Sequence, residues 1–315
     1  MTITTNRHKR APRYLAILVA SGFATTAAYA PPFNLTEVAP GNFVHYGKHV
    51  TFEDKDHDDI ANIGFIVGER CVAIVDTGGS ISTGEALKAA MAERTQVPVC
   101  YVINTHVHFD HLLGNAAFTA AAQPKFVGHA NLADAVASNV GFFLKNYGGN
   151  LGPQPSAAMI IGPDTMVDST LELDLGGRKL LLRAWPKAHT NADLTVLDQA
   201  TGTLWLGDLL FRERIPSLDG SIKGWLAVIE ELQGEKVGAV IPGHGPAGDD
   251  LRVALAAEKQ YLEVLVKDVR GHLAAGDPID QAAEQAGASE QGRWQLWEQH
   301  HKRNVSKVYT ELEWE

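Results

Sequence analysis

The chain has 315 residues, of which 45% are hydrophobic and 20% are charged. This composition is typical of a globular protein with a full core, and it excludes a disordered tract, a collagen-like repeat and a disulfide-rich scaffold. The formal charge of −10 at pH 7 argues against a nucleic-acid partner, because phosphate binding needs clustered lysine and arginine side chains. The length fits one large domain with appendages.

The first thirty residues have the pattern of a secretory signal peptide. Four basic residues precede an apolar stretch over 14–24, and small residues follow as far as Ala30. The apolar stretch is shorter than the roughly 20 residues that a membrane-spanning helix needs, so we expect cleavage and export, with no permanent membrane span. Loss of residues 1–30 removes four basic and no acidic residues, which changes the formal charge from −10 to −14.

Strands and helices alternate in the first half of the remaining chain. We expect strands over 62–67 and 71–75, a helix over 81–94, a strand over 97–104, a short helix over 112–121, a strand over 125–128 and a helix over 131–147. The strand–helix–strand unit forms a parallel crossover, which places Asp76 and His106 at the same edge of the sheet.

The second half repeats this style after a segment of different composition. Residues 146–163 are rich in glycine, proline and asparagine and predict a flexible insertion or lid. Further elements are predicted as strands between 171 and 206, a helix over 221–232, a strand over 240–241, a helix over 249–275 and a helical C-terminus. Two sheets between two helix layers satisfy this pattern. We therefore expect an α/β fold (α+β by some schemes), an αββα sandwich, with a catalytic domain over 31–250 and a helical extension over 251–315 packed on it.

A histidine-rich run follows the strand that ends near residue 104. Its sequence is H-x-H-x-D-H, and it contains His106, His108, Asp110 and His111. In an extended segment alternate side chains point the same way, so His106 and His108 can hold one ion. A turn at Phe109 would direct Asp110 and His111 towards a second ion. The run therefore predicts a metal site.

Three more polar residues follow apolar runs and complete a ligand set for two ions. These residues are His189, Asp208 and His244. Functional sites of α/β proteins form at the carboxyl ends of strands, which favours a role for all three. Taken singly, each has a less favoured alternative: His189 as a capping or turn residue, Asp208 as a helix N-cap and His244 as a loop histidine.

These motifs resemble those of the metallo-β-lactamase superfamily. The resemblance implies that His106, His108 and His189 hold a first metal, that Asp110, His111 and His244 hold a second, and that Asp208 bridges both. It also implies that Asp76 orients the ligands from behind. β-Lactamases of this superfamily place cysteine or serine where this chain has Asp208, whereas glyoxalase-II-like and lactonase-like hydrolases place a bridging aspartate, so β-lactam hydrolysis is not implied.

Further stretches are similar to the quinoprotein relay system zinc metallohydrolases. They comprise the start at 31–47, the acidic segment 53–59, the run 211–221 and the C-terminal sequence RNVSKVYTELEWE. This narrower resemblance implies a periplasmic location and a link to quinoprotein dehydrogenase systems. The acidic surface could attract a basic cytochrome-like or quinoprotein partner.

Imidazoles and carboxylates without a thiolate favour two Zn²⁺ ions, and manganese and iron are the alternatives. A hydroxide bridging the two ions would attack a carbonyl-type bond of a small-molecule substrate, in an ester, thioester, lactone or amide. Asp110 is the candidate catalytic residue, as the group that orients this hydroxide or relays its proton. A β-lactam-hydrolysing enzyme, a mononuclear iron oxygenase of the same fold and a non-enzymatic metal-binding accessory protein remain open alternatives.

Substrate contacts are predicted on two groups of side chains. Arg212 and Arg214 could bind a substrate carboxylate, although exposed surface arginines are equally common. Aromatic residues could line a pocket or belong to the core, and these are Phe142, Phe143, Tyr147 and Trp225.

Cys71 and Cys100 are the only cysteines, and neither has the spacing of a metal ligand. Cys71 lies five residues before Asp76 and Cys100 six before His106, so adjacent strands bring their Cα atoms within about 8 Å. A disulfide also needs both side chains on the same face, and the one-residue difference in offset leaves this open. We therefore favour a pair of thiols over a disulfide.

Overall fold

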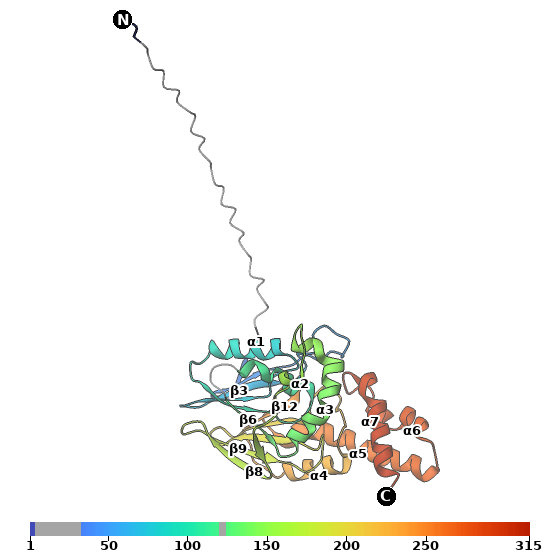
Figure 1. The fold of residues 1–315 in the computed structure, drawn as a ribbon. Helices are drawn as coiled ribbons and strands as arrows, with labels where there is room; N and C mark the ends of the chain where they lie inside the picture. Colours follow the sequence, from blue (N-terminus) through green and yellow to red (C-terminus); the bar gives the residue numbers. More distant parts are fainter. Residues whose placement is uncertain (4–32, 120–123) are drawn as a thin grey trace. The chain divides into compact units, whose positions relative to one another are not determined.

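A computed structural model describes residues 1–3, 33–119 and 124–315, so the predicted signal peptide lies almost wholly outside the described residues. From Phe33 to the C-terminus the chain forms one unit. Within it two β-sheets stack face to face, and helices cover their outer faces (Figure 1). This is the αββα sandwich that the sequence predicts.

The first sheet has seven strands in sequence order, antiparallel from β1 to β4 and parallel from β4 to β7. The strands are β1 (Thr36–Ala39), β2 (Asn42–His45), β3 (Ile63–Val67), β4 (Val72–Val75), β5 (Val99–Ile103), β6 (Lys125–His129) and β7 (Thr165–Val167). The predicted β3–β4 hairpin and the parallel crossover from β4 to β5 are both confirmed.

The second sheet has five strands in the order β12-β11-β10-β9-β8. They are β8 (Thr170–Asp174), β9 (Lys179–Ala184), β10 (Leu194–Asp198), β11 (Thr203–Phe211) and β12 (Ala239–His244). Strands β8 to β11 are antiparallel, whereas β11 and β12 run parallel because helix α4 connects them.

The α-helices are α1 (Ile81–Ala92), α2 (Phe109–Leu112), α3 (Leu132–Tyr147), α4 (Ile222–Leu232), α5 (Leu251–Ala275), α6 (Ile279–Gln285) and α7 (Trp297–Leu312). Short 3-10 helices are η1 (Leu113–Phe118), η2 (Gly148–Leu151), η3 (Ala157–Met159) and η4 (Ala288–Glu290). The helix predicted over 112–121 thus begins earlier, at Phe109, and continues as a 3-10 turn. No helix among the described residues has the length and apolar character to cross a membrane.

Strand β4 shows why the sheet needs cover on both faces. Val72 and Ile74 pack in a cluster with Leu87 of α1, whereas Ala73 and Val75 pack between the two sheets. All four side chains are buried, as expected for a continuous apolar run in a sheet with a parallel section. Asp76 follows directly after Val75, at the carboxyl end of β4 and outside these two apolar clusters.

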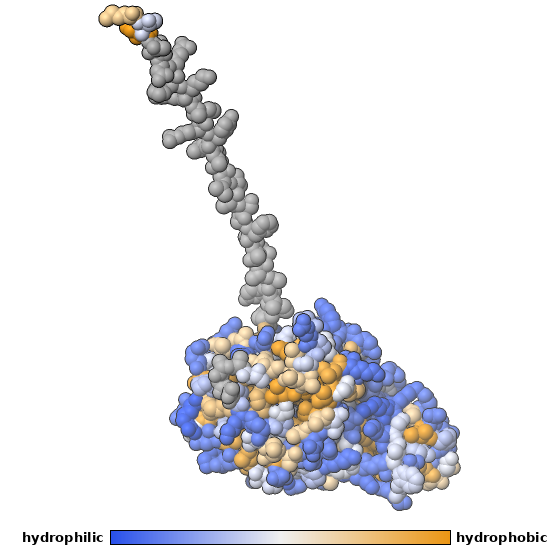
Figure 2. Space-filling view, in the orientation of Figure 1, coloured by the Kyte–Doolittle hydropathy of each residue, from blue (hydrophilic) through white to orange (hydrophobic). Residues whose placement is uncertain are grey.

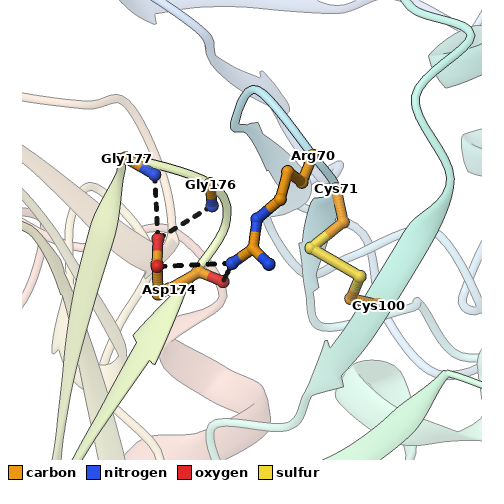
Figure 3. Close-up of a disulfide and its surroundings, with 6 residues drawn as sticks. All are labelled: Arg70, Cys71, Cys100, Asp174, Gly176 and Gly177. Atoms are coloured by element: carbon orange, nitrogen blue, oxygen red, sulfur yellow. Dashed lines mark hydrogen bonds and ion pairs between the residues drawn. A yellow bond between two sulfur atoms is a disulfide. The ribbon is translucent and has the colours of Figure 1, made fainter.

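The expectation of two free thiols is wrong, because Cys71 and Cys100 form a disulfide with a Cα–Cα distance of 5.6 Å (Figure 3). Val72 pairs with Val99, but Ala73 pairs with Tyr101, so Cys100 is an extra residue in the β4–β5 register. Such a bulge redirects the side chain and offsets the one-residue difference in spacing. The predicted closeness of the Cα atoms is confirmed.

The segment predicted as a flexible insertion or lid is packed in the structure. It contains η2 and η3, and Leu151 and Ile160 are buried in a cluster with Phe143 of α3. The Asn150 side chain donates a hydrogen bond to the carbonyl of Gly79 (2.8 Å), which ties the segment to the turn before α1. Apolar anchors and this side-chain bond hold a sequence whose composition alone indicates a loop.

Candidate metal centre

The predicted site residues meet where strands from both sheets end. His106 and His108 follow β5, and α2 begins directly afterwards, so its first turn carries Asp110 and His111. His244 is the last residue of β12. The turn at Phe109 therefore separates the histidine-rich run into two parts, as the sequence predicts.

Asp208 and His189 reach the site by routes that the sequence did not predict. Asp208 lies inside β11 rather than after it, because the β11–β12 register shifts on either side of Gly207 and bends the strand. Gly207 has φ +51°, and a Cβ there would lie 2.5 Å from the Cβ of Thr105, so only glycine permits this bend. His189 lies in the loop after β9, which ends at Ala184.

The first group of ligand atoms comprises His106 Nε2, His108 Nδ1, His189 Nε2 and Asp208 Oδ2. His108 Nδ1 lies 3.1 Å from His106 Nε2 and 3.0 Å from His189 Nε2. Asp208 Oδ2 lies 3.6 Å from His106 Nε2 and 3.3 Å from His189 Nε2. Ligands about 2.0–2.1 Å from a tetrahedral metal are about 3.3–3.4 Å apart, so the spacing of this group fits one ion.

The second group comprises Asp110 Oδ2, His111 Nε2 and His244 Nε2, joined by the other oxygen of Asp208. Asp208 Oδ1 lies 3.2 Å from His111 Nε2 and 3.3 Å from His244 Nε2. Asp110 Oδ2 lies 3.6 Å and 3.4 Å from the same two nitrogens. Because each oxygen of Asp208 faces a different group, this side chain could contribute a ligand atom to each of two ions.

The remaining nitrogen of each histidine is held by a separate hydrogen-bond partner. The pairs are His106 Nδ1 with Thr105 Oγ1 (3.0 Å), His108 Nε2 with Asp219 Oδ2 (3.0 Å), His111 Nδ1 with Asp76 Oδ2 (2.8 Å), His189 Nδ1 with the Ser217 carbonyl (2.7 Å) and His244 Nδ1 with the Ile60 carbonyl (2.7 Å). Such partners fix ring orientation and tautomer in metal sites. Among the described residues, the buried atoms His111 Nε2 and Asp208 Oδ1 have no hydrogen-bond partner. The donor set therefore fits metal ions.

Asp76 takes the position behind the ligands that the resemblance implies. Its Oδ2 accepts from the Thr105 hydroxyl (2.7 Å) as well as facing His111, and its Oδ1 accepts from the Thr105 backbone N–H (2.8 Å). Asp76 has φ +55°, a left-handed conformation that is uncommon outside glycine. The carboxylate thus connects the ends of β4 and β5 to His111.

Burial lowers the pKa of His106, His189 and His244, whereas neighbouring carboxylates outweigh burial and raise the pKa of His108 and His111. Burial lowers the pKa of His189 to about 3, so its ring is neutral at pH 7 and its nitrogen can act as a ligand. Burial also lowers the pKa of His111, but the carboxylates of Asp208, Asp110 and Asp76 outweigh it and raise the pKa. A site that attracts a proton so strongly also attracts a metal cation.

Sequence reasoning missed the residues that hold His108 and His189 from behind. Asp219 and Ser217 lie in the run 211–221 that carries the narrower resemblance, and this was the only signal for them. Asp219 also pairs with Arg303 of α7. Burial raises the pKa of Asp219, but the hydrogen bond from His108 and the charge of Arg303 outweigh burial and hold it well below its usual range.

A cavity of about 690 Å³ opens onto the two ligand groups. Its lining includes five aromatic residues, which are Phe52, Phe109, Phe142, Phe143 and Tyr147. It also includes the cations Lys187, Arg214 and Arg303. Figure 2 shows apolar surface gathered where Figure 1 places α2 and α3, the helices that carry four of the five aromatic residues. Helix α7 contributes His300 and Arg303, so the C-terminal helices help to shape the cavity.

The structure separates the predicted substrate-binding residues. Arg214 lines the cavity, whereas Arg212 donates to the carbonyls of Pro246 and Ala247 (both 2.6 Å) and does not. Phe142, Phe143 and Tyr147 line the cavity, but Trp225 is fully buried in the core against His189. A separate groove of about 750 Å³ over β8 to β10 contains none of the site residues.

Comparison with known proteins agrees with this fold. A metallo-beta-lactamase from Pontibacter korlensis superimposes with a TM-score of 0.58 and 21% identity, covering 73% of this chain and 98% of that one. The stereoselective inverting sec-alkylsulfatase Pisa1 from Pseudomonas sp. gives a TM-score of 0.67 at 17% identity, covering 88% of this chain and 50% of that one. No curated protein sequence matches the chain. The family model described as "Metallo-beta-lactamase superfamily" matches residues 58–244, more than half of the sequence, and the chain belongs to this superfamily.

Proposed function

We propose that the protein is an exported hydrolase that uses two zinc ions to cleave a carbonyl-type bond in a small molecule. One observation carries this proposal: the two carboxylate oxygens of Asp208 face two separate groups of ligand atoms, at the spacing expected between ligands that share an ion. A mononuclear site would leave the ligand atoms of the second group, Asp110, His111 and His244, without an ion to bind. The residue set therefore favours the two-metal hydrolase over a mononuclear oxygenase.

When bound, the two ions would supply a Lewis acid and activate water at neutral pH. The chain's own residues would transfer the proton and shape the cavity. Asp110 lines the cavity and lies beside His111 and His244, so its carboxylate can accept a proton from the attacking water and return it to the leaving group. The aromatic lining excludes bulk water from the same space, which strengthens electrostatic interactions within it.

Export is the second part of the proposal. The signal-peptide pattern of residues 1–30 supports it, and so does the Cys71–Cys100 disulfide, because such bonds persist in oxidising compartments such as the periplasm. The formal charge of −14 after removal of these residues favours a basic periplasmic partner, such as a cytochrome of a quinoprotein system. On this proposal residues 31–250 form the catalytic domain and residues 251–315 an extension that completes the cavity.

The test is metal analysis of the natively purified protein together with a hydrolysis panel. We expect about two zinc ions per chain and hydrolysis of at least one of an ester, a thioester, a lactone and an amide probe. A chelator should abolish that activity, and added zinc should restore it. One iron per chain with no hydrolysis would contradict the proposal, and preferential turnover of nitrocefin would instead identify a β-lactam-hydrolysing enzyme.

A further inference from the structure

The cavity contains one buried cation, Arg214, that has no ion-pair partner within 4.0 Å in the described part of the protein, where the nearest carboxylates that act on it are those of Asp110 and Asp208. Arg214 follows β11 on a loop held by two backbone hydrogen bonds, from Gln295 N to the Glu213 carbonyl (2.8 Å) and from Ile215 N to the Gln295 carbonyl (3.0 Å). Glu213 has φ +66°, a left-handed backbone conformation that residues other than glycine rarely adopt. The two hydrogen bonds hold the loop in this conformation. Arg214 is only 3% exposed and lines the cavity beside Asp208 and His244.

Among the described residues, no carboxylate lies within 4.0 Å of the Arg214 guanidinium, and its Nε has no hydrogen-bond partner. The fold treats other sheltered arginines differently. Arg178, with 14% of its side chain exposed, pairs with Asp198 at 2.5 Å. A buried guanidinium without such a partner costs several kcal/mol. The arrangement therefore calls for an anion from outside the chain.

Arg214 lies 6.0 Å from the centroid of the Phe211 ring, and its one side-chain hydrogen-bond partner among the described residues, His244, does not satisfy it in a metal-binding site. Its Nη1 lies 2.8 Å from His244 Nδ1 and 3.4 Å from His244 Nε2. When His244 Nε2 faces a metal, its Nδ1 carries the proton and donates it to the Ile60 carbonyl (2.7 Å). Neither nitrogen then has a lone pair for Arg214. The guanidinium is left as a set of donors directed at the cavity.

The other cations of the cavity are placed differently. Arg303 already pairs with Asp219, and Lys187 also borders two further surface grooves. The cavity also has an aromatic part, in which Phe109 stacks on Tyr147 with ring centroids 3.9 Å apart and Phe142 is 53% exposed. The same cavity is therefore lined by a single buried cation without an ion-pair partner, by aromatic side chains and by candidate metal ligands. The volume of about 690 Å³ is that of a small-molecule site.

We propose that Arg214 binds an anionic group of the substrate, so that the hydrolase acts on organic anions with an apolar body. The statement that the bound anion is a substrate rests on the proposed function. The statement that Arg214 binds an anion does not. The anionic group lies beside His244, the apolar body lies against Phe142 and Phe143, and the bond to be cleaved lies between them at the metal centre.

Calorimetric binding of two probes of equal size tests the inference on the natively purified protein. 3-Phenylpropionate carries a carboxylate, and 3-phenylpropanamide is its uncharged counterpart. We expect the carboxylate to bind at least about tenfold more tightly, as one charge-assisted hydrogen bond would provide. Arg214→Met should remove this preference and change binding of the amide less than twofold, whereas Arg214→Lys should retain part of it. Arg70→Met is the control, since it removes the same charge from an exposed turn.

Each outcome decides the matter. Equal binding of the two probes by the wild type would overturn the inference, because the cavity would then have no preference for an anion. An undiminished carboxylate preference in Arg214→Met would also overturn it, because the metal ions themselves would then hold the anion. A lower melting temperature of ligand-free Arg214→Met would also overturn it, since an unbalanced buried charge should destabilise the wild type. Metal content and ester hydrolysis of the same preparations report on the proposed function separately, so absence of both would leave the anion site standing alone.

Discussion

Asp208 connects the two halves of the metal centre, because each of its oxygens faces a different group of histidines. Its position depends on a glycine: Gly207 lets β11 pass close to Thr105 and bend towards His111. Asp219 and Asp76 act one layer further out, each holding the far nitrogen of a histidine. At the scale of residues, the centre is a set of carboxylates that neutralise metal charge and orient imidazoles.

Asp208→Ala removes one ligand from each group. We expect the metal content to fall from about two ions towards one ion per chain and the rate of hydrolysis to fall at least about tenfold. Metal analysis and steady-state kinetics measure the two effects, with Asp280→Ala, an exposed position on α6, as the control. Unchanged stoichiometry and rate would remove Asp208 from the ligand set.

Glu258 of α5 is fully buried, and its Oε1 accepts from the Phe211 N–H (3.0 Å) while Oε2 has no partner among the described residues. Burial raises the pKa of this carboxyl well above its ordinary value, so the folded protein holds the proton more tightly than the unfolded chain. The free energy of unfolding therefore falls as pH rises from the unfolded pKa to the folded one.

Glu258→Gln should remove this pH dependence. The variant should gain stability relative to the wild type between pH 5 and pH 8, by at most about 1.4 kcal/mol for each pH unit below the folded pKa. Denaturant unfolding at both pH values measures the gain. An equal difference at the two pH values would show that the carboxyl has the same pKa in both states.

Helix α7 is the element that holds the loop behind the first ligand group. Asn304 accepts from the Leu218 N–H (3.0 Å) and donates to the Pro216 carbonyl (2.6 Å), so it holds both neighbours of Ser217. The carbonyl of Ser217 in turn accepts from His189. At the scale of elements, a helix far along the chain thus orients a ligand of the metal centre.

Asn304→Ala should loosen that loop. Loss of its buried hydrogen bonds should lower the free energy of unfolding by about 1–3 kcal/mol, and metal in the first group should dissociate more readily. Unfolding and chelator competition measure the two effects, with Thr310→Ala as the control, because the Thr310 hydroxyl bonds only within the helix. Lower stability with unchanged metal affinity would show that the loop does not position His189.

At the scale of the whole molecule, the candidate metal centre lies at one end of strands β4 and β5, and the Cys71–Cys100 disulfide lies near the other. The disulfide joins the start of β4 to β5, and the neighbouring Arg70 contacts Asp174 at the end of β8 in the second sheet (Figure 3). The backbone N–H of Arg70 also donates to the carbonyl of Leu175, the residue after β8. Asp76 follows the other end of β4, so the disulfide and the candidate metal site lie towards opposite ends of this strand.

Replacement of both cysteines, Cys71→Ser with Cys100→Ser, should lower the free energy of unfolding by about 3–4 kcal/mol, the loop-closure value for two cysteines 29 residues apart. Metal content should not change, because no ligand contacts the disulfide. Denaturant unfolding and metal analysis test both statements. A reductant should lower the stability of the wild type but not that of the double variant, and an equal effect on both would contradict the assignment.

The sequence by itself predicted most of the elements of the sandwich and the residues that the structure brings together in two groups of candidate ligands. Apolar periodicity indicates strands such as β3 and β4, and the H-x-H-x-D-H spacing places four ligands within one short run, because both are local properties of the chain. Only the tertiary structure decided the partners of those ligands, the walls of the cavity and the disulfide. Asp219, Ser217 and Asn304 matter through contacts between distant segments, and the Cys71–Cys100 bond depends on one extra residue in the β4–β5 register. A shift of one residue reverses the face of a side chain in a strand, so such features follow from packing and register and not from local pattern.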